Sequence, residues 1–129
     1  MYGLKPNTVY EASIKVMSES SLDCCTAAFN VYEVVHGNNP LHEFGVSDAK
    51  DLIRLIREMG SLYKAIDYGL TTLGFIQCSP DVGQICFLDK SLCICISKGL
   101  YAVKGKDSVT IVARSDSPDN KVSSWKCQQ

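Results

Sequence analysis

The order of hydrophobic and polar residues divides the chain into a helical first half and a second half of strands. The first apolar positions, after Pro6, recur at helical spacing. Tyr10, Ile14 and Met17 fall at i, i+4 and i+7, which predicts a helix that buries this face. Asn7 is the predicted N-cap of that helix.

A second predicted helix starts at Asp23, and Gly37 with the following Asn-Asn-Pro ends it. Its apolar residues form a continuous stripe, which covers a wide arc of the helix. A wide apolar arc is typical of a helix that is covered on most sides, so this helix should be central and buried. The stripe consists of Cys24, Ala27, Ala28, Val31, Val34 and Val35.

Two further helices are expected before the strands begin. The third should start after Ser47, a good N-cap, and end at Gly60. The fourth is a short helix from Leu62 to about Tyr68, with Gly69 closing it.

From residue 74 onward the hydrophobic period changes from helical to two, which is the period of a strand. Only short turns separate the predicted strands, and such turns suit antiparallel hairpins. We therefore expect an α+β fold in which N-terminal helices pack on a C-terminal antiparallel sheet, as a single domain over residues 1–129. The predicted strands cover residues 84–88, 92–97, 100–103 and 108–113.

The composition of the chain argues against some classes of binding partner. The chain has 129 residues and a formal net charge of −1, and its 13 basic residues are scattered, so a nucleic-acid groove is not expected. No stretch reaches the ~20 apolar residues of a membrane span, and charges interrupt the first twenty residues, so we expect neither a membrane segment nor a signal peptide. The seven cysteines are then expected to be reduced thiols, as in an intracellular or viral setting.

The strongest candidate for a reactive residue is Cys24, because it opens the predicted buried helix directly after Asp23. A thiol in the first turn lies near the positive end of the helix dipole, which favours the thiolate. A cysteine at a helix start, packed against an antiparallel sheet, is also the layout of papain-like peptidases. In those enzymes a histidine of the sheet deprotonates the thiol.

Several short motifs follow one another along the chain. They are Asp23-Cys24 opening a helix, the loop Gly37-Asn38-Asn39-Pro40, Met59-Gly60 ending a helix, Ser79-Pro80-Asp81-Val82-Gly83 entering a strand, the strand Leu92 to Gly99, and Trp125. In these motifs, about residues 20–127 resemble the NlpC/P60-like superfamily, and more closely a phage-associated branch of it whose function is unknown. The resemblance implies a papain-like fold and a phage origin.

Two departures from the family pattern identify the chain as a degenerate member. Active relatives carry Asp-Cys-Ser-Gly, whereas Cys25 and Thr26 follow Cys24 here. They also place a histidine at the start of the strand that matches residues 92–97, and this chain has no histidine after His42. His36 lies about 18 Å along the helix axis from Cys24, because each residue adds ~1.5 Å. We therefore expect no enzymatic activity from the usual triad.

Each candidate residue also has a structural interpretation. Cys24 is interpreted as a residue that packs the first turn, with a nucleophile as the alternative, and Cys25 as a flanking residue. The four cysteines of the strand region are expected to pack the core, with a metal site as the alternative, so we predict no metal and no cofactor. Trp125 should anchor the C-terminus. The four strand-region cysteines are Cys78, Cys86, Cys93 and Cys95.

The sequence thus favours a non-catalytic phage or prophage protein that acts through protein–protein contacts, in the host cytoplasm or in the virion. Its partner would be a phage structural protein, if it is a virion or tail component, or a host defence protein, if it is an inhibitor. The alternative is a cysteine hydrolase acting on a peptidoglycan peptide or another amide, with Cys24 as the nucleophile.

Overall fold

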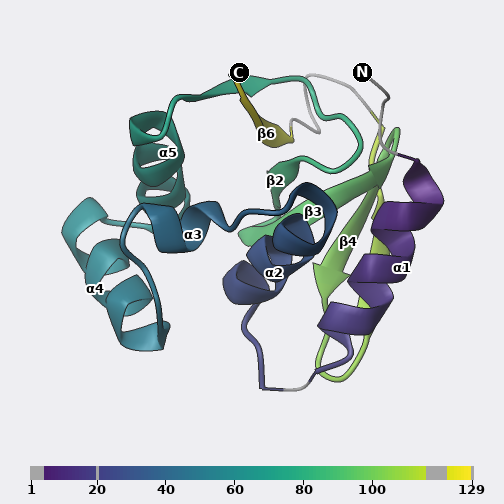
Figure 1. Ribbon diagram of the computed structural model, residues 1–129, viewed down its shortest axis with the longest axis horizontal. Helices are drawn as coiled ribbons and strands as arrows, with labels where there is room; N and C mark the ends of the chain where they lie inside the picture. The colour runs from purple at the N-terminus through teal and green to yellow at the C-terminus, as the bar shows by residue number, and fades with distance from the viewer. Residues whose placement is uncertain (1–4, 20, 116–121, 129) are drawn as a thin grey trace.

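A computed structural model describes residues 5–19, 21–115 and 122–128. In these residues, helices pack on one antiparallel sheet, so the α+β class expected from the sequence is confirmed (Figure 1). The helices are α1 (Pro6–Met17), α2 (Cys24–His36), α3 (Pro40–Glu43), α4 (Ala49–Met59) and α5 (Leu62–Thr72). The strands are β1 (Phe75–Cys78), β2 (Ile85–Leu88), β3 (Ser91–Ser97), β4 (Leu100–Lys104), β5 (Val109–Ala113) and β6 (Ser123–Cys127).

The sheet has the strand order β1-β6-β2-β3-β4-β5, and every neighbouring pair is antiparallel. The four strands predicted from the alternating pattern are β2 to β5, and they form the expected meander. The prediction had neither β1 nor β6. β6 returns from the end of the chain and pairs between β1 and β2, which makes the sheet wider than the meander alone.

Helix α2 is the central helix, as the wide apolar stripe predicts. Asp23 caps its start, and Gly37 ends it in the left-handed conformation at φ 91°. It buries more side chains than any other described helix and packs against β3. Val34, however, is exposed, so the buried face is narrower than the stripe.

Helix α1 buries a different face from the predicted one. Tyr10 and Ile14 are 40% and 41% exposed, and of the three predicted residues only Met17 is buried. The core face consists instead of Val9, Ala12, Ser13 and Met17. Asn7 is not the cap: the N-cap is Lys5, whose side chain makes no capping hydrogen bond.

The ends of α4 and α5 also differ from the prediction. The N-cap of α4 is Asp48, and Ser47 instead donates from its hydroxyl to Asp51 Oδ2 at 2.9 Å. α5 does not end at Gly69 but continues through it to Thr72. The ring of Phe44 packs on Gly69, so closely that an added Cβ would lie 2.7 Å from it.

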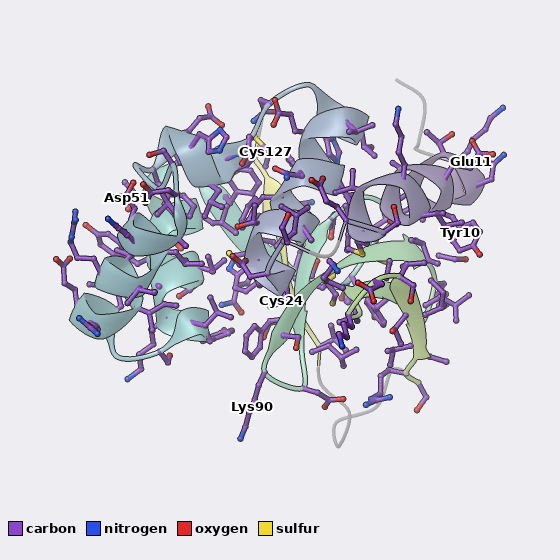
Figure 2. The ribbon with its side chains drawn as sticks, turned by 90° about the horizontal axis from the view of Figure 1, so that it is seen from below. Tyr10, Glu11, Cys24, Asp51, Lys90 and Cys127 are labelled. Carbon is purple, nitrogen blue, oxygen red and sulfur yellow. The ribbon has the colours of Figure 1, made fainter. Side chains whose placement is uncertain are left out.

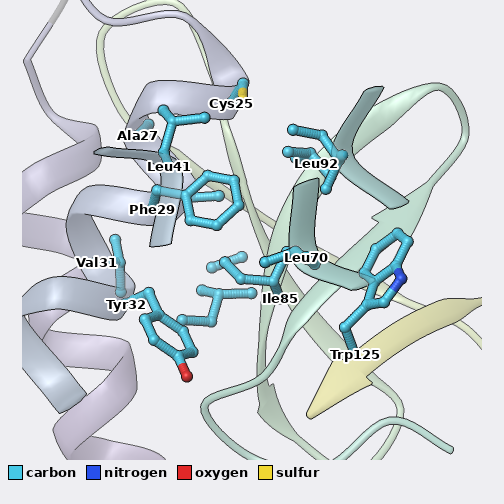
Figure 3. Close-up of a cluster of buried hydrophobic side chains, with 14 of the residues drawn as sticks. Cys25, Ala27, Phe29, Val31, Tyr32, Leu41, Leu70, Ile85, Leu92 and Trp125 are labelled. Atoms are coloured by element: carbon cyan, nitrogen blue, oxygen red, sulfur yellow. The ribbon is translucent and has the colours of Figure 1, made fainter. Parts of the chain in front are cut away.

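The two faces of the sheet differ in what covers them. The helices cover one face, and large apolar side chains fill the space between the layers (Figure 3). The central members of this core are Phe29 of α2, Leu70 of α5, and Ile85, Leu92 and Trp125 of the sheet. The opposite face carries a smaller cluster of Cys86, Leu88, Cys93, Cys95 and Tyr101. None of the described helices is long and apolar enough to cross a bilayer.

Candidate functional site at the start of helix α2

The start of α2 is fixed by its capping residue. Asp23 has an extended backbone, and its carboxylate accepts from the Thr26 backbone N–H at 2.7 Å. It also accepts from the Thr26 hydroxyl at 3.0 Å. Both carboxylate oxygens are therefore used within the first turn, which is the role of an N-cap. Asp23 serves the helix rather than a neighbouring catalytic group.

The two cysteines that follow Asp23 have different surroundings. Cys24 is the first residue of α2 and is half-buried (Figure 2). Cys25 is 1% exposed and belongs to the main core. Burial, followed by the charges of Asp23 and Cys24, raises the pKa of the Cys25 thiol far above its usual range. Cys25 is thus a protonated packing residue, and only Cys24 is placed where a reagent could reach it.

Helix α2 runs so that Cys24 lies near the start of β3. At the opposite end of the helix, His36 donates from Nε2 to the Gly83 carbonyl oxygen at 2.8 Å. Gly83 in turn donates its N–H to the Cys95 carbonyl oxygen at 2.7 Å, near the end of β3. Figure 3 shows Cys25 and Leu92 at the same end of the core. The first part of β3 therefore lies towards the Cys24 end of α2.

That strand segment offers no base. Its buried residue on the helix-facing side is Leu92, which is fully buried in the main core. Cys93, the next residue, belongs to the cluster on the opposite face of the sheet. Burial, followed by Cys86, Cys95 and Cys24, raises its pKa well above the usual range. The helix-facing side chain of this segment is therefore a hydrocarbon, and the neighbouring thiol is protonated and lies on the other face of the sheet.

Both histidines of the chain lie away from Cys24. His36 is the last residue of α2, and its ring stacks on Tyr32 with the centroids 4.0 Å apart. His42 is exposed on α3, which follows the C-terminal end of α2. The structure therefore does not bring Cys24 together with either histidine. For His36, this separation is the one that the length of the helix predicts.

The strand-region cysteines make hydrogen bonds as thiols. Cys78 donates to Gln84 Oε1 at 3.3 Å, and Cys86 donates to the Ser124 hydroxyl at 3.4 Å. Cys86 and Cys93 are register partners on neighbouring strands, and Cys95 donates to the Ser97 carbonyl. Burial is the main cause that raises the pKa of Cys86 to about 12 and that of Cys95 to about 11.

No group of three or more metal-ligating side chains converges in the part of the chain that the structure describes. The thiol hydrogen bonds just described are those of packed, neutral cysteines. The arrangement supports a packing role for this cluster.

The prediction that Trp125 anchors the C-terminus is confirmed. The indole is fully buried, and its Nε1 donates to Asp67 Oδ1 on α5 at 2.9 Å. Gln77 of β1 donates to the same oxygen at 3.0 Å and to the Tyr63 hydroxyl at 2.7 Å. This polar cluster joins β1, β6 and α5. Sequence reasoning missed it, because Asp67 and Trp125 meet only through the pairing of β6 within the sheet.

Surface side chains outside the Cys24 region include a basic face on α4. Lys50, Ile53, Arg54 and Arg57 line one shallow hollow. The Asp51 carboxylate lies 3.7 Å from the Arg54 guanidinium on the same helix, so one acidic group borders the basic face.

Searches against models of protein families, curated proteins and solved structures found no match for this chain. The likeness to NlpC/P60 domains therefore rests on the short motifs of the sequence.

Proposed function

We propose that the protein is a non-catalytic phage or prophage protein, which acts through protein–protein contacts on an NlpC/P60-like scaffold. The observation that carries this proposal is the surroundings of Cys24. Its thiol starts α2 near the first part of β3, where the chain supplies Leu92. A cysteine nucleophile needs a base that removes its proton. Neither of the two histidines of the chain lies near it.

Two kinds of role fit such a scaffold. One is a virion or tail component, whose partner is a phage structural protein. The other is an inhibitor in the host cytoplasm, whose partner is a host defence protein. The resemblance to a phage-associated branch supports the origin in a phage or prophage. Large apolar side chains exposed on several elements support a role in contacts, since partner proteins bury such groups.

The competing function is a cysteine hydrolase acting on a peptidoglycan peptide or another amide. One observation favours it: Cys24 is half-buried, whereas Cys25 beside it is sealed in the core. Such an enzyme requires a base beside the thiol, so a test that separates the two functions must remove the thiol alone.

A complementation experiment makes this separation. A phage or prophage that lacks the protein is supplied with wild type, Cys24→Ser or Cys127→Ser, and its propagation is measured. Cys127 is the matched control, because it is an exposed free thiol on β6, far along the chain from α2. We expect all three proteins to complement equally, since a contact protein does not need a nucleophile. Release of amines from purified peptidoglycan should stay at background for all three.

One result would overturn the proposal. If Cys24→Ser melts like wild type but fails to complement, while Cys127→Ser complements, the thiol of Cys24 is a nucleophile. A serine without a strong base is far less reactive than a cysteine, so this pattern would identify a working enzyme.

A further inference from the structure

Strand β5 forms one end of the sheet, and its own residues lack the features that usually protect an edge strand. Its residues are Val109, Thr110, Ile111, Val112 and Ala113, and none of them is charged. Edge strands normally carry lysine, proline or a bulge, which prevents pairing with another chain. β5 has no such residue, and its pairing with β4 is regular along its whole length.

The backbone of β5 presents hydrogen-bonding groups to its outer side in a fixed pattern. Gly105 donates to the Ser108 carbonyl at 2.8 Å, and Arg114 donates to the Gly99 carbonyl at 2.9 Å. Because bonded positions alternate along an antiparallel strand, residues 110 and 112 also face β4. The N–H and C=O groups of Val109, Ile111 and Ala113 therefore point away from the sheet. No strand in the described part of the chain pairs with that side.

Apolar side chains surround this edge. Ile111 is 40% exposed and Leu100 of β4 is 37% exposed. Tyr10 and Ile14 of α1 are exposed to a similar degree, and α1 packs on β4 and β5. Figure 2 shows Tyr10 on the side of α1 towards that end of the sheet. We call Tyr10, Ile14, Leu100 and Ile111 the β5 edge patch.

We propose that a second copy of this chain pairs with β5 in the antiparallel sense, about a two-fold axis that passes by Ile111. In this register Val109 lies opposite Ala113 of the partner subunit, and the outward-pointing groups of the two strands bond to each other. Antiparallel pairing of identical strands is isologous, so it closes as a dimer. The two β5 edge patches then meet across the axis.

Charge complementarity favours a second copy over an unrelated strand. The same register sets Arg114 opposite Ser108 of the partner subunit, one position along the chain from the exposed residue Asp107 of the partner subunit. The two-fold axis repeats this attraction at the other end of the strand. Arg114 is already held at the end of β5 by an ion pair with Asp89. The net charge of −1 gives two copies little overall repulsion.

This inference goes beyond the proposed function and stands even if Cys24 proves to be a nucleophile. Its test is sedimentation equilibrium of the full chain, from low to high micromolar concentration, for wild type, Ile111→Lys and Ile76→Lys. Ile76 is the matched control, because it is an isoleucine of similar exposure, 39%, on the opposite edge strand β1. We expect a wild-type dimer, an unchanged dimer for Ile76→Lys, and at least about tenfold weaker dimerisation for Ile111→Lys, because like charges would meet across the axis.

Amide hydrogen exchange of the wild type gives a second readout that needs no variant. Exchange at Val109, Ile111 and Ala113 should slow as the protein concentration rises, while exchange at Phe75 to Cys78 should not change. A wild-type chain that is monomeric at every concentration would overturn the proposal. So would an Ile111→Lys protein that melts like wild type and dimerises as tightly.

Discussion

At the scale of single residues, two adjacent residues can have different roles because they are buried to different degrees. Cys24 and Cys25 are adjacent, yet one is half-buried at the start of α2 and the other lies in the main core. A turn of helix carries consecutive side chains about 100° apart, which is enough to send one into the core. The sequence interpretation treated Cys25 as a flanking residue, whereas the structure gives it a packing role.

Gly69 offers a sharp prediction at this scale. Alanine favours a helix over glycine by about 1 kcal/mol, so propensity alone predicts that Gly69→Ala stabilises α5. The Phe44 ring, however, lies 2.7 Å from the position of the new Cβ. We expect Gly69→Ala to lower the free energy of unfolding by about 1–3 kcal/mol, as overpacking in a core does. Urea denaturation measures this change.

Two further variants test the cause. Thr71→Ala changes an exposed position of the same helix and should leave stability within about 0.5 kcal/mol of wild type. Phe44→Leu should reduce the cost of Gly69→Ala in the double variant, because the smaller side chain leaves room for the methyl group. If Gly69→Ala lowered the free energy of unfolding equally in wild type and in Phe44→Leu, contact with the Phe44 ring would not be the reason for glycine at position 69.

At the scale of elements, the cap of α2 carries a prediction of its own. Asp23→Ala removes the carboxylate that accepts from the backbone N–H and hydroxyl of Thr26. We expect the free energy of unfolding to fall by about 1 kcal/mol, within the usual range for lost caps. Asp23→Asn should retain most of the stability, since asparagine caps helices almost as well. Glu11→Ala, at an exposed site on α1, controls for loss of charge, and an equal effect there would contradict the capping role.

The sequence predicted the ends of a helix well where a capping residue acts within one turn. It predicted the buried face of a helix poorly where packing against other elements determines that face. The start and end of α2 follow from Asp23 and Gly37, which act within one turn. The buried face of α1 follows instead from its contacts with α2 and the sheet. The small residues Ala12 and Ser13 allow this close packing, and the Ser13 hydroxyl is satisfied by the Val9 carbonyl at 2.8 Å. A hydrophobicity pattern favours Tyr10 and Ile14, because it takes no account of size.

Strands show the same division. The alternation that predicts β2 to β5 is a property of each segment, and the hairpin turns between them are short. β1 and β6 depend on each other across some fifty residues, since β6 pairs with β1 on one side and β2 on the other. Most of β6 is polar, and only Trp125 hints that the segment is buried.

At the scale of the whole molecule, the sequence could predict which reactive residue types the candidate site has and which it lacks. The absence of a histidine after His42 is visible in the sequence, and it already argues against the usual triad. Which strand residues lie towards Cys24 depends instead on which end of β3 packs near the start of α2. That placement follows from how α2 packs on the sheet, and it is shown by the contact between His36 and Gly83 at the other end.

The buried thiols of the sheet make the stability of the whole molecule sensitive to alkaline pH. Burial raises the pKa of Cys86 from 9.0 to about 12, and that of Cys95 to about 11. Above pH 9 the unfolded chain therefore releases protons that the folded protein keeps. Folding then binds protons, so the free energy of unfolding falls as the pH rises. The stabilisation is complete below pH 9 and is lost as the pH rises towards the folded pKa values.

Urea denaturation at pH 8, 9, 10 and 11 tests this linkage in wild type, Cys86→Ala and Cys127→Ala. Cys86 alone should contribute a fall of about 1 kcal/mol per pH unit above pH 9, since one pKa unit corresponds to about 1.4 kcal/mol. Cys86→Ala should be less stable at pH 8, because its side chain leaves a cavity, but its stability should fall less steeply with pH. Cys127 is exposed, so Cys127→Ala should follow the wild-type slope. Other groups titrate in this range as well, yet they do so in all three proteins, and the difference between slopes isolates the thiol. Identical slopes for wild type and Cys86→Ala would mean that Cys86 ionises in the folded protein as readily as in the unfolded chain, which is incompatible with its burial between β3 and β6.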